Sequence, residues 1–200
     1  MIGFPQLPNR WAAAQWQACK DERASQIAEF ALSLPLLILF VVGIFDFSGA
    51  LSLKQKLTNA AREGARVAAA DPFSDLGLPP ASGVPASIGD AFQVVDNYLI
   101  SEKINDCGLE GTAPTQTAGT LQWTSPSLGG CPGGTGLQLT VDRGCITPQT
   151  NGQGTINVVN TCVTLLYPYK WQFTGVAGLL GGRFAPQSRI TTIAVAFNEN

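Results

Sequence analysis

The residues of this chain that could do chemistry are its acidic residues and cysteines, because the chain has no histidine. Without histidine, acid–base catalysis at neutral pH would depend on carboxylates, and the 14 Asp and Glu residues show no recognisable pairing. The glycine-rich segment CPGGTG, residues 131–136, lacks the Lys followed by Ser or Thr of a phosphate-binding loop. The sequence therefore argues against an enzyme and predicts no catalytic residue and no cofactor.

The five cysteines fall into two groups. Cys19 precedes a long apolar run, whereas four follow it: Cys107, Cys131, Cys145 and Cys162. No C-x-x-C spacing occurs among them, so with no histidine we predict no metal site. Two disulfides in an oxidising compartment are expected, with free buried thiols as the alternative, and the sequence leaves all three connectivities open.

Two acidic residues interrupt the apolar run. From Phe30 to Phe45 no residue is charged, and between Ile27 and Leu53 only Glu29 and Asp46 are. About 20 largely apolar residues are enough for a helix to cross a bilayer. We therefore expect a transmembrane segment at about residues 30–53, with Asp46 about 26 Å along the helix from Glu29. There Asp46 would lie near the outer interface, solvated or facing a basic residue of a partner.

The helix is expected to continue as an amphipathic segment, so that one helix covers residues 25–71. Small residues recur at four-residue spacing, which lets another backbone approach closely. Gly64 costs roughly 1 kcal/mol relative to Ala in a helix, so it requires a packing reason. Asp71-Pro72 ends the helix because a residue before proline disfavours the α region. The predicted helix-packing residues are Leu53, Leu57, Ala60, Gly64 and Ala68.

Residues 72–200 are expected to form an extracytoplasmic α+β domain. After a Pro- and Gly-rich connection, a second helix runs from Ser87, with a capping-box-like Asp90, to about Ile104. Four β-like runs follow and are expected to pair as an antiparallel sheet: Thr120–Thr124, Leu137–Asp142, Thr155–Tyr169 and Arg189–Phe197. The last run, RITTIAVAF, alternates two faces, and the more strongly apolar face is expected to lie on the helix.

Composition limits the partners. Charged residues make up 13% of the chain and the net charge is −2, so the chain lacks the basic surface that nucleic acid requires.

One alternative to a membrane anchor is a cleaved signal peptide, because Ser48-Gly49-Ala50 follows the apolar run. The helical pattern continues through that site, which argues against release as a soluble protein.

Three motifs of the first helix occur in a specific order: A-SQIAEF-ALSLPLLILF, then GIFDFS, then AAREGARVAAA. Together they resemble the TadE-like pseudopilins of bacterial tight-adherence (Tad/Flp, type IV-like) pilus systems. The resemblance implies a pilin-like fold and a cytoplasmic leader, residues 1–24, that a prepilin peptidase removes between Ala24 and Ser25. The family usually has Gly before the cut, where this chain has Ala24. Glu29 would become the fifth residue of the mature chain.

The resemblance implies a structural minor pilin, processed and then used in pilus assembly and surface adhesion. Its partners would be other pilin subunits through the first helix, the peptidase, an inner-membrane assembly platform and membrane lipid. Glu29 would pair with the new amino group of Ser25, or be solvated among lipid headgroups. Basic residues flank both sides of the apolar run, so charge does not orient it. The cysteines favour an extracytoplasmic domain on a single-pass inner-membrane protein. The alternative function is a permanently anchored extracytoplasmic binding domain that enters no filament.

Overall fold

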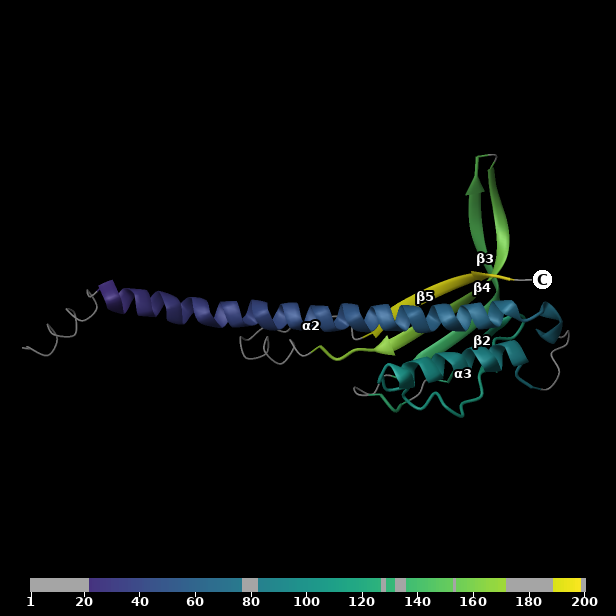
Figure 1. Cartoon of the computed structure of the whole chain (residues 1–200), viewed down its shortest axis with the longest axis horizontal. Helices are drawn as coiled ribbons and strands as arrows, with labels where there is room; N and C mark the ends of the chain where they lie inside the picture. Colours follow the sequence, from purple (N-terminus) through teal and green to yellow (C-terminus); the bar gives the residue numbers. More distant parts are fainter. Residues whose placement is uncertain are drawn as a thin grey trace, which may run out of the picture.

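One long helix organises the molecule. The computed structural model describes residues 22–76, 83–126, 129–131, 136–152, 154–171 and 189–198. Helix α2 runs from Glu22 to Ala70, 49 residues, or about 74 Å at 1.5 Å per residue. It continues through Pro35 and ends where Asp71-Pro72 was expected to end it. Figure 1 shows that its first half extends as a rod, while its second half lies along the globular part.

Two further helical segments follow α2. The 3-10 helix η1 (Phe73–Leu76) leads to α3 (Ala86–Ser101), which confirms the second helix. The predicted capping box is wrong, because α3 has no side-chain cap hydrogen bond. The backbone N–H of Ser87 instead donates to Asp75 Oδ2 at 3.0 Å, so a residue of η1 satisfies the first turn of α3.

The sheet has five strands in sequence order, and every neighbouring pair is antiparallel. This confirms the α+β prediction of a long helix, a second helix and an antiparallel sheet. The short strand β1 was not predicted, and β3 is longer than expected. The strands are β1 (Thr115–Gln116), β2 (Gln122–Thr124), β3 (Gln138–Asn151), β4 (Gly154–Pro168) and β5 (Arg189–Phe197).

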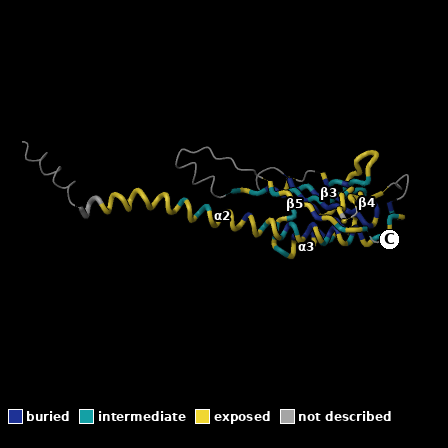
Figure 2. Tube along the Cα trace, turned by 90° about the horizontal axis from the view of Figure 1, so that it is seen from above, coloured by how far each residue is buried: buried dark blue, intermediate teal, exposed yellow. Residues whose placement is uncertain are grey.

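The core lies between one face of the sheet and the two helices. Trp123, Val141, Val163 and Ala194 occupy neighbouring register positions on β2 to β5, and all are buried. Figure 2 shows the buried positions concentrated where the second half of α2 meets α3 and the sheet. Apolar burial at this layer is the main favourable contribution to folding of the globular part.

Strand β5 presents the opposite face from the one expected. Thr192 and Ala194 are buried, whereas Ile193, Val195 and Phe197 are 61%, 50% and 62% exposed. The prediction that the more strongly apolar face lies on the helix is therefore wrong. Small side chains on the inner face let α2 lie close to β5, so available space outweighs side-chain hydrophobicity here.

Strands β3 and β4 extend beyond the sheet as a hairpin that projects from the globular part (Figure 1). The register shifts between Asp142 and Cys145, and pairing then continues to Asn151 and Gly154. A bulge of this kind bends a strand and increases its twist, which explains the change in direction.

Candidate membrane-anchoring and assembly site

The first half of α2 is apolar and uncovered. This helix is long enough and apolar enough to cross a membrane, and none of its most apolar stretch is buried against the rest of the chain. Ile27, Phe30, Leu32 and Ile44 are each at least 65% exposed. Large apolar side chains at such exposure over successive turns indicate a lipid-facing or partner-facing surface.

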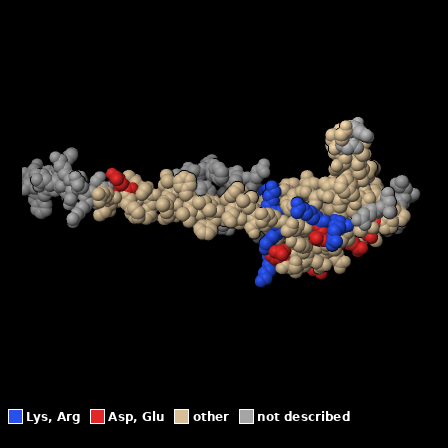
Figure 3. All heavy atoms as spheres, turned by 45° about the horizontal axis from the view of Figure 1, so that its top comes forward, with Lys and Arg blue, Asp and Glu red and all other residues tan. Residues whose placement is uncertain are grey.

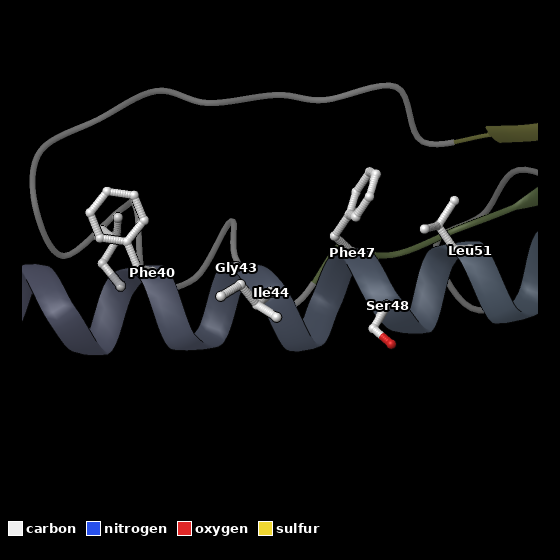
Figure 4. A pocket seen from close by; sticks show the side chains of 7 residues that line it. Phe40, Gly43, Ile44, Phe47, Ser48 and Leu51 are labelled. Atoms are coloured by element: carbon white, nitrogen blue, oxygen red, sulfur yellow. The ribbon is translucent and has the colours of Figure 1, made fainter.

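A shallow groove runs along this exposed surface. Figure 4 shows the side chains of Phe40 and Phe47 projecting from the helix, with Gly43 between them. Because Gly43 has no side chain, the surface is lower there. The lining residues are Leu39, Phe40, Gly43, Ile44, Phe47, Ser48 and Leu51. The groove is almost wholly apolar and suits an acyl chain or another apolar helix better than a polar ligand.

The predicted cleavage and pairing residues lie in the first turns of α2. Ala24 and Ser25 have helical backbone, and Glu29 is exposed. Glu29 follows Ser25 by four residues, which is one helical turn or about 6 Å of rise. The two residues therefore lie on the same side of the helix, about one turn apart.

Asp46 has a partner within its own chain. The Tyr169 hydroxyl donates a hydrogen bond to Asp46 Oδ1 at 2.8 Å and lies 3.1 Å from the Asp46 carbonyl oxygen. Asp46 is only 6% exposed, although Phe45 and Phe47 beside it are 75% and 58% exposed. Asp46 and Ala50, about one helical turn apart, are thus buried at the end of the exposed half of α2, and Tyr169 from the segment after β4 contacts the first of them. Asp46 contacts a tyrosine of the same chain, so the expectation that it is solvated does not hold.

Tyr169 was not among the predicted site residues. Its ring packs edge-on against Trp171, with ring centroids 5.0 Å apart. Burial, followed by the hydrogen bond and charge of Asp46, raises the pKa of Tyr169 from 10.0 to about 12. The only sequence signal was the aromatic run YPYKW, residues 167–171. Nothing local connects that run to Asp46, which lies 123 residues earlier.

The predicted helix-packing residues lie inside the globular part. Leu57, Ala60 and Ala68 are fully buried, Gly64 is buried, and Leu53 is partly buried. A Cβ at Gly64 would lie 2.6 Å from Val95 Cγ2 of α3 and 3.8 Å from Val163 Cγ1 of β4. In the single chain these contacts are intramolecular. The row holds α2 against α3 and the sheet, and the buried residues are not exposed to a neighbouring subunit.

The four cysteines after the apolar run form two disulfides, as expected. Cys107–Cys131 joins the turn after α3 to the segment before β3, with Cα atoms 4.7 Å apart. Cys145–Cys162 joins β3 to β4 beside the bulge, with Cα atoms 5.8 Å apart. The sequence left the connectivity open; in the structure the first of the four cysteines pairs with the second, and the third pairs with the fourth. Both bridges stabilise the globular part, and the second fixes the base of the projecting hairpin.

A buried arginine connects the elements at the far end of the domain. Arg143 is fully buried; it donates to the Asp71 carbonyl oxygen at 2.6 Å and to Asp75 Oδ1 at 3.3 Å. Its guanidinium also lies 4.8 Å from the ring centroid of Phe73. Because Asp75 also caps α3, one ion pair holds α2, η1, α3 and β3 together.

A second acidic position lies beside α3. Asp96 is 7% exposed, and its Oδ1 has no hydrogen-bond partner among the residues that the structure describes. Burial, followed by the charges of Asp106 and Glu110, raises the pKa of Asp96 above 3.8. Within the described part of the chain, no group of three or more His, Cys, Asp or Glu side chains could hold a metal ion. The position is a buried carboxyl group with two other acids nearby.

The comparison with family models locates the similarity in α2. Residues 24–66 match the family described as TadE-like protein, which confirms the resemblance for this segment. Neither the curated proteins nor the solved structures gave a match. The matched segment begins at the predicted cleavage residue and includes both the exposed apolar half of α2 and part of its buried half.

Proposed function

From the TadE-like segment at residues 24–66, we propose that this protein is a structural minor pilin or pseudopilin of a Tad-type pilus. The observation that carries the proposal is that this segment is one continuous helix with two environments. Its first half is apolar and exposed, and its second half forms part of the core of a globular domain. A protein built in this way can be held in the bacterial inner membrane and later join a bundle of similar helices. Its contribution to assembly and adhesion would be structural.

Processing by a prepilin peptidase would release the chain from its leader. Cleavage between Ala24 and Ser25 creates an amino group about 6 Å along the helix from Glu29. Pairing of these two charges would reduce the cost of placing a carboxylate at the edge of the apolar segment. The same carboxylate could pair with the amino group of a neighbouring subunit.

Contacts between subunits are proposed for the exposed half of α2. The packing row around Gly64 is buried within the chain, whereas most of the surface from Ile27 to Leu51 is exposed, with Asp46 and Ala50 as buried exceptions. Small residues such as Gly43 let helices approach closely in an apolar environment. The groove beside Gly43 is therefore the proposed position for the helix of a second pilin subunit or of the assembly platform.

The test is the mass of the protein purified from cells with and without the peptidase. We expect Ser25 as the N-terminus only when the peptidase is present. A chain that retains residues 1–24 in both strains would contradict the processing proposal. Ala24→Gly is the matched variant, since it restores the residue that the family usually has and should be processed at least as well.

The alternative is a permanently anchored extracytoplasmic domain that binds a partner without entering a filament. The observation in its favour is Ala24 at the position before the cut. It predicts an unprocessed chain and no effect of Glu29→Gln on function. The pilin proposal predicts that Glu29→Gln leaves membrane insertion intact and reduces recovery of the protein in sheared pili.

A further inference from the structure

The end of the globular domain that faces the exposed rod, which we call the base, is defined by contacts between distant segments. Tyr169 at the end of β4 contacts Asp46, while Val163 of the same strand lies beside Gly64. Strand β4 therefore runs antiparallel to α2, toward the apolar half. At the end of α3, Glu102 pairs with Lys56 at 3.0 Å. The base thus includes the C-terminal ends of β4 and α3.

The base is rich in positive charge. Its basic residues are Lys54 and Lys56 on α2, Lys103 after α3, Lys170 after β4, and Arg189, which pairs in register with Pro168 at the start of β5. The acidic residues at this end include Asp46, Glu102 and Asp106. Burial, followed by the charge of Asp106, raises the pKa of Tyr167. Figure 3 shows basic side chains grouped where the rod meets the globular part. This grouping is notable because the whole chain carries a net charge of −2.

The exposed apolar surface of α2 matches a bilayer in length. Phe30 and Leu51 are 65% and 46% exposed, and they are 21 residues, or about 32 Å, apart along the helix. The hydrocarbon layer is about 30 Å thick, so Lys54 would lie where headgroups begin. The Tyr169 hydroxyl reaches Asp46, which lies eight residues or about 12 Å before Lys54 along α2, so the Tyr169–Trp171 pair would lie on the acyl-chain side of the headgroups, in the interfacial zone that amphipathic aromatic side chains favour.

We infer that the base binds the anionic phospholipid headgroups of the leaflet on its side of the membrane, through Lys54, Lys170 and the Tyr169–Trp171 pair. This inference rests on the proposed function, since it requires that α2 spans the bilayer. Lys54 and Lys170 are exposed and supply the charge. Tyr169, packed against Trp171, connects the segment after β4 to Asp46.

The experiment uses the full chain in nanodiscs that contain phosphatidylglycerol and phosphatidylcholine. Bromine near the carbonyl end of the acyl chains is placed on one lipid or the other, and tryptophan quenching is measured. Trp11→Phe with Trp16→Phe removes two other signals, and Trp123 is only 2% exposed. Adding Trp171→Phe to this background provides the blank. We expect brominated phosphatidylglycerol to quench Trp171 more strongly than brominated phosphatidylcholine.

A matched pair of double variants tests the charges. Each basic residue close to an anionic surface favours binding about fivefold, so Lys54→Gln with Lys170→Gln should bring the quenching ratio close to one. Arg62→Gln with Arg66→Gln makes the same change in charge farther along α2 and should leave the ratio unchanged. Raising the salt concentration should reduce the ratio in the parent protein.

Two kinds of result would contradict the inference. Equal quenching by the two lipids, or no quenching of Trp171 in a chain that floats with the nanodiscs, would overturn headgroup binding and leave the membrane anchor standing. A chain that does not float with the nanodiscs would contradict the anchor itself, and with it this inference.

Discussion

At the scale of single residues, Asp46 shows how a polar group is accommodated in an apolar surface. A carboxylate among exposed phenylalanines is costly unless it is hydrogen-bonded. The Tyr169 hydroxyl supplies such a bond, and Asp46 is only 6% exposed. This bond therefore joins the segment after β4 to α2 near the point where the exposed rod meets the globular domain.

Tyr169→Phe should destabilise the folded domain by about 2 kcal/mol, because a hydrogen bond to a charged group is lost. Thermal unfolding in detergent micelles measures this loss. Tyr98→Phe is the matched control, since Tyr98 is partly buried and lies on α3. A similar loss in both variants would mean that the effect is common to removal of a tyrosine hydroxyl and does not depend on Asp46.

The raised pKa of Tyr169 adds a dependence on pH. Its contribution to stability is complete below pH 10.0, the ordinary tyrosine value, and is lost as pH rises toward about 12. The stability difference between the parent chain and Tyr169→Phe should therefore shrink over that interval. A constant difference would mean that the hydroxyl does not titrate there.

Asp96→Asn should stabilise the protein at neutral pH by about 1 kcal/mol, because the ionised carboxyl group is buried beside other acids. The pKa of Asp96 is raised, so its contribution to stability is present below pH 3.8 and is lost as pH rises through the folded-state value. The gain from Asp96→Asn should accordingly vanish below pH 3.8. Asp90→Asn, at an exposed position of α3, should change the melting temperature little at either pH.

At the scale of elements, the contact between α2 and α3 depends on one glycine. Gly64→Ala places a methyl group 2.6 Å from Val95 Cγ2, where it cannot fit without movement. Such overpacking costs about 1–3 kcal/mol, so the melting temperature should fall. Ala60 and Ala68, on the same face of α2, already carry a methyl group, so the restriction to glycine applies to position 64 and not to the whole row.

Val95→Ala in the Gly64→Ala background should return part of that stability, because it removes the clashing methyl group. Val95→Ala alone creates a cavity and should destabilise the parent chain. The opposite signs in the two backgrounds identify direct contact. Additive losses would show that Gly64 is required for another reason.

The elements also show what the sequence could predict. Helix α2, its end at Asp71-Pro72 and the range of β5 follow from local patterns, because apolar length, proline and alternation act over a few residues. The inner face of β5 and the hydrogen bond by which Asp75 caps α3 do not follow from local patterns. Both depend on which distant element approaches, and the alternation in RITTIAVAF is the same whichever face is covered.

The candidate site likewise has features that the sequence predicts and features that depend on tertiary contacts. The positions of Glu29 and Asp46 in the apolar run follow from the sequence, and so does the even number of cysteines in the domain. The partner of Asp46, the sequential disulfide connectivity and the burial of the Gly64 row follow only from tertiary contacts. Small residues at helical spacing predict close packing without saying which chain supplies the neighbour.

At the scale of the whole molecule, charge and polarity change along one axis. An exposed apolar rod leads to a base with basic residues, and the far end carries Asp71 and Asp75 beside the buried Arg143. Both disulfides lie in the globular part. A membrane crossed by the rod would thus place every disulfide on one side.

That arrangement predicts the cysteine chemistry of the protein in its cells. Disulfides persist in oxidising compartments, so the four domain cysteines should resist a maleimide reagent added during denaturation and should react after reduction. Cys19 lies in the proposed leader and serves as an internal reporter of processing. A processed chain should show no thiol before reduction and four afterwards. One reactive thiol before reduction, abolished by Cys19→Ser, would show that the leader is retained while the domain is still outside. Reaction of the four domain cysteines without reduction would place the domain in a reducing compartment and contradict its extracytoplasmic position.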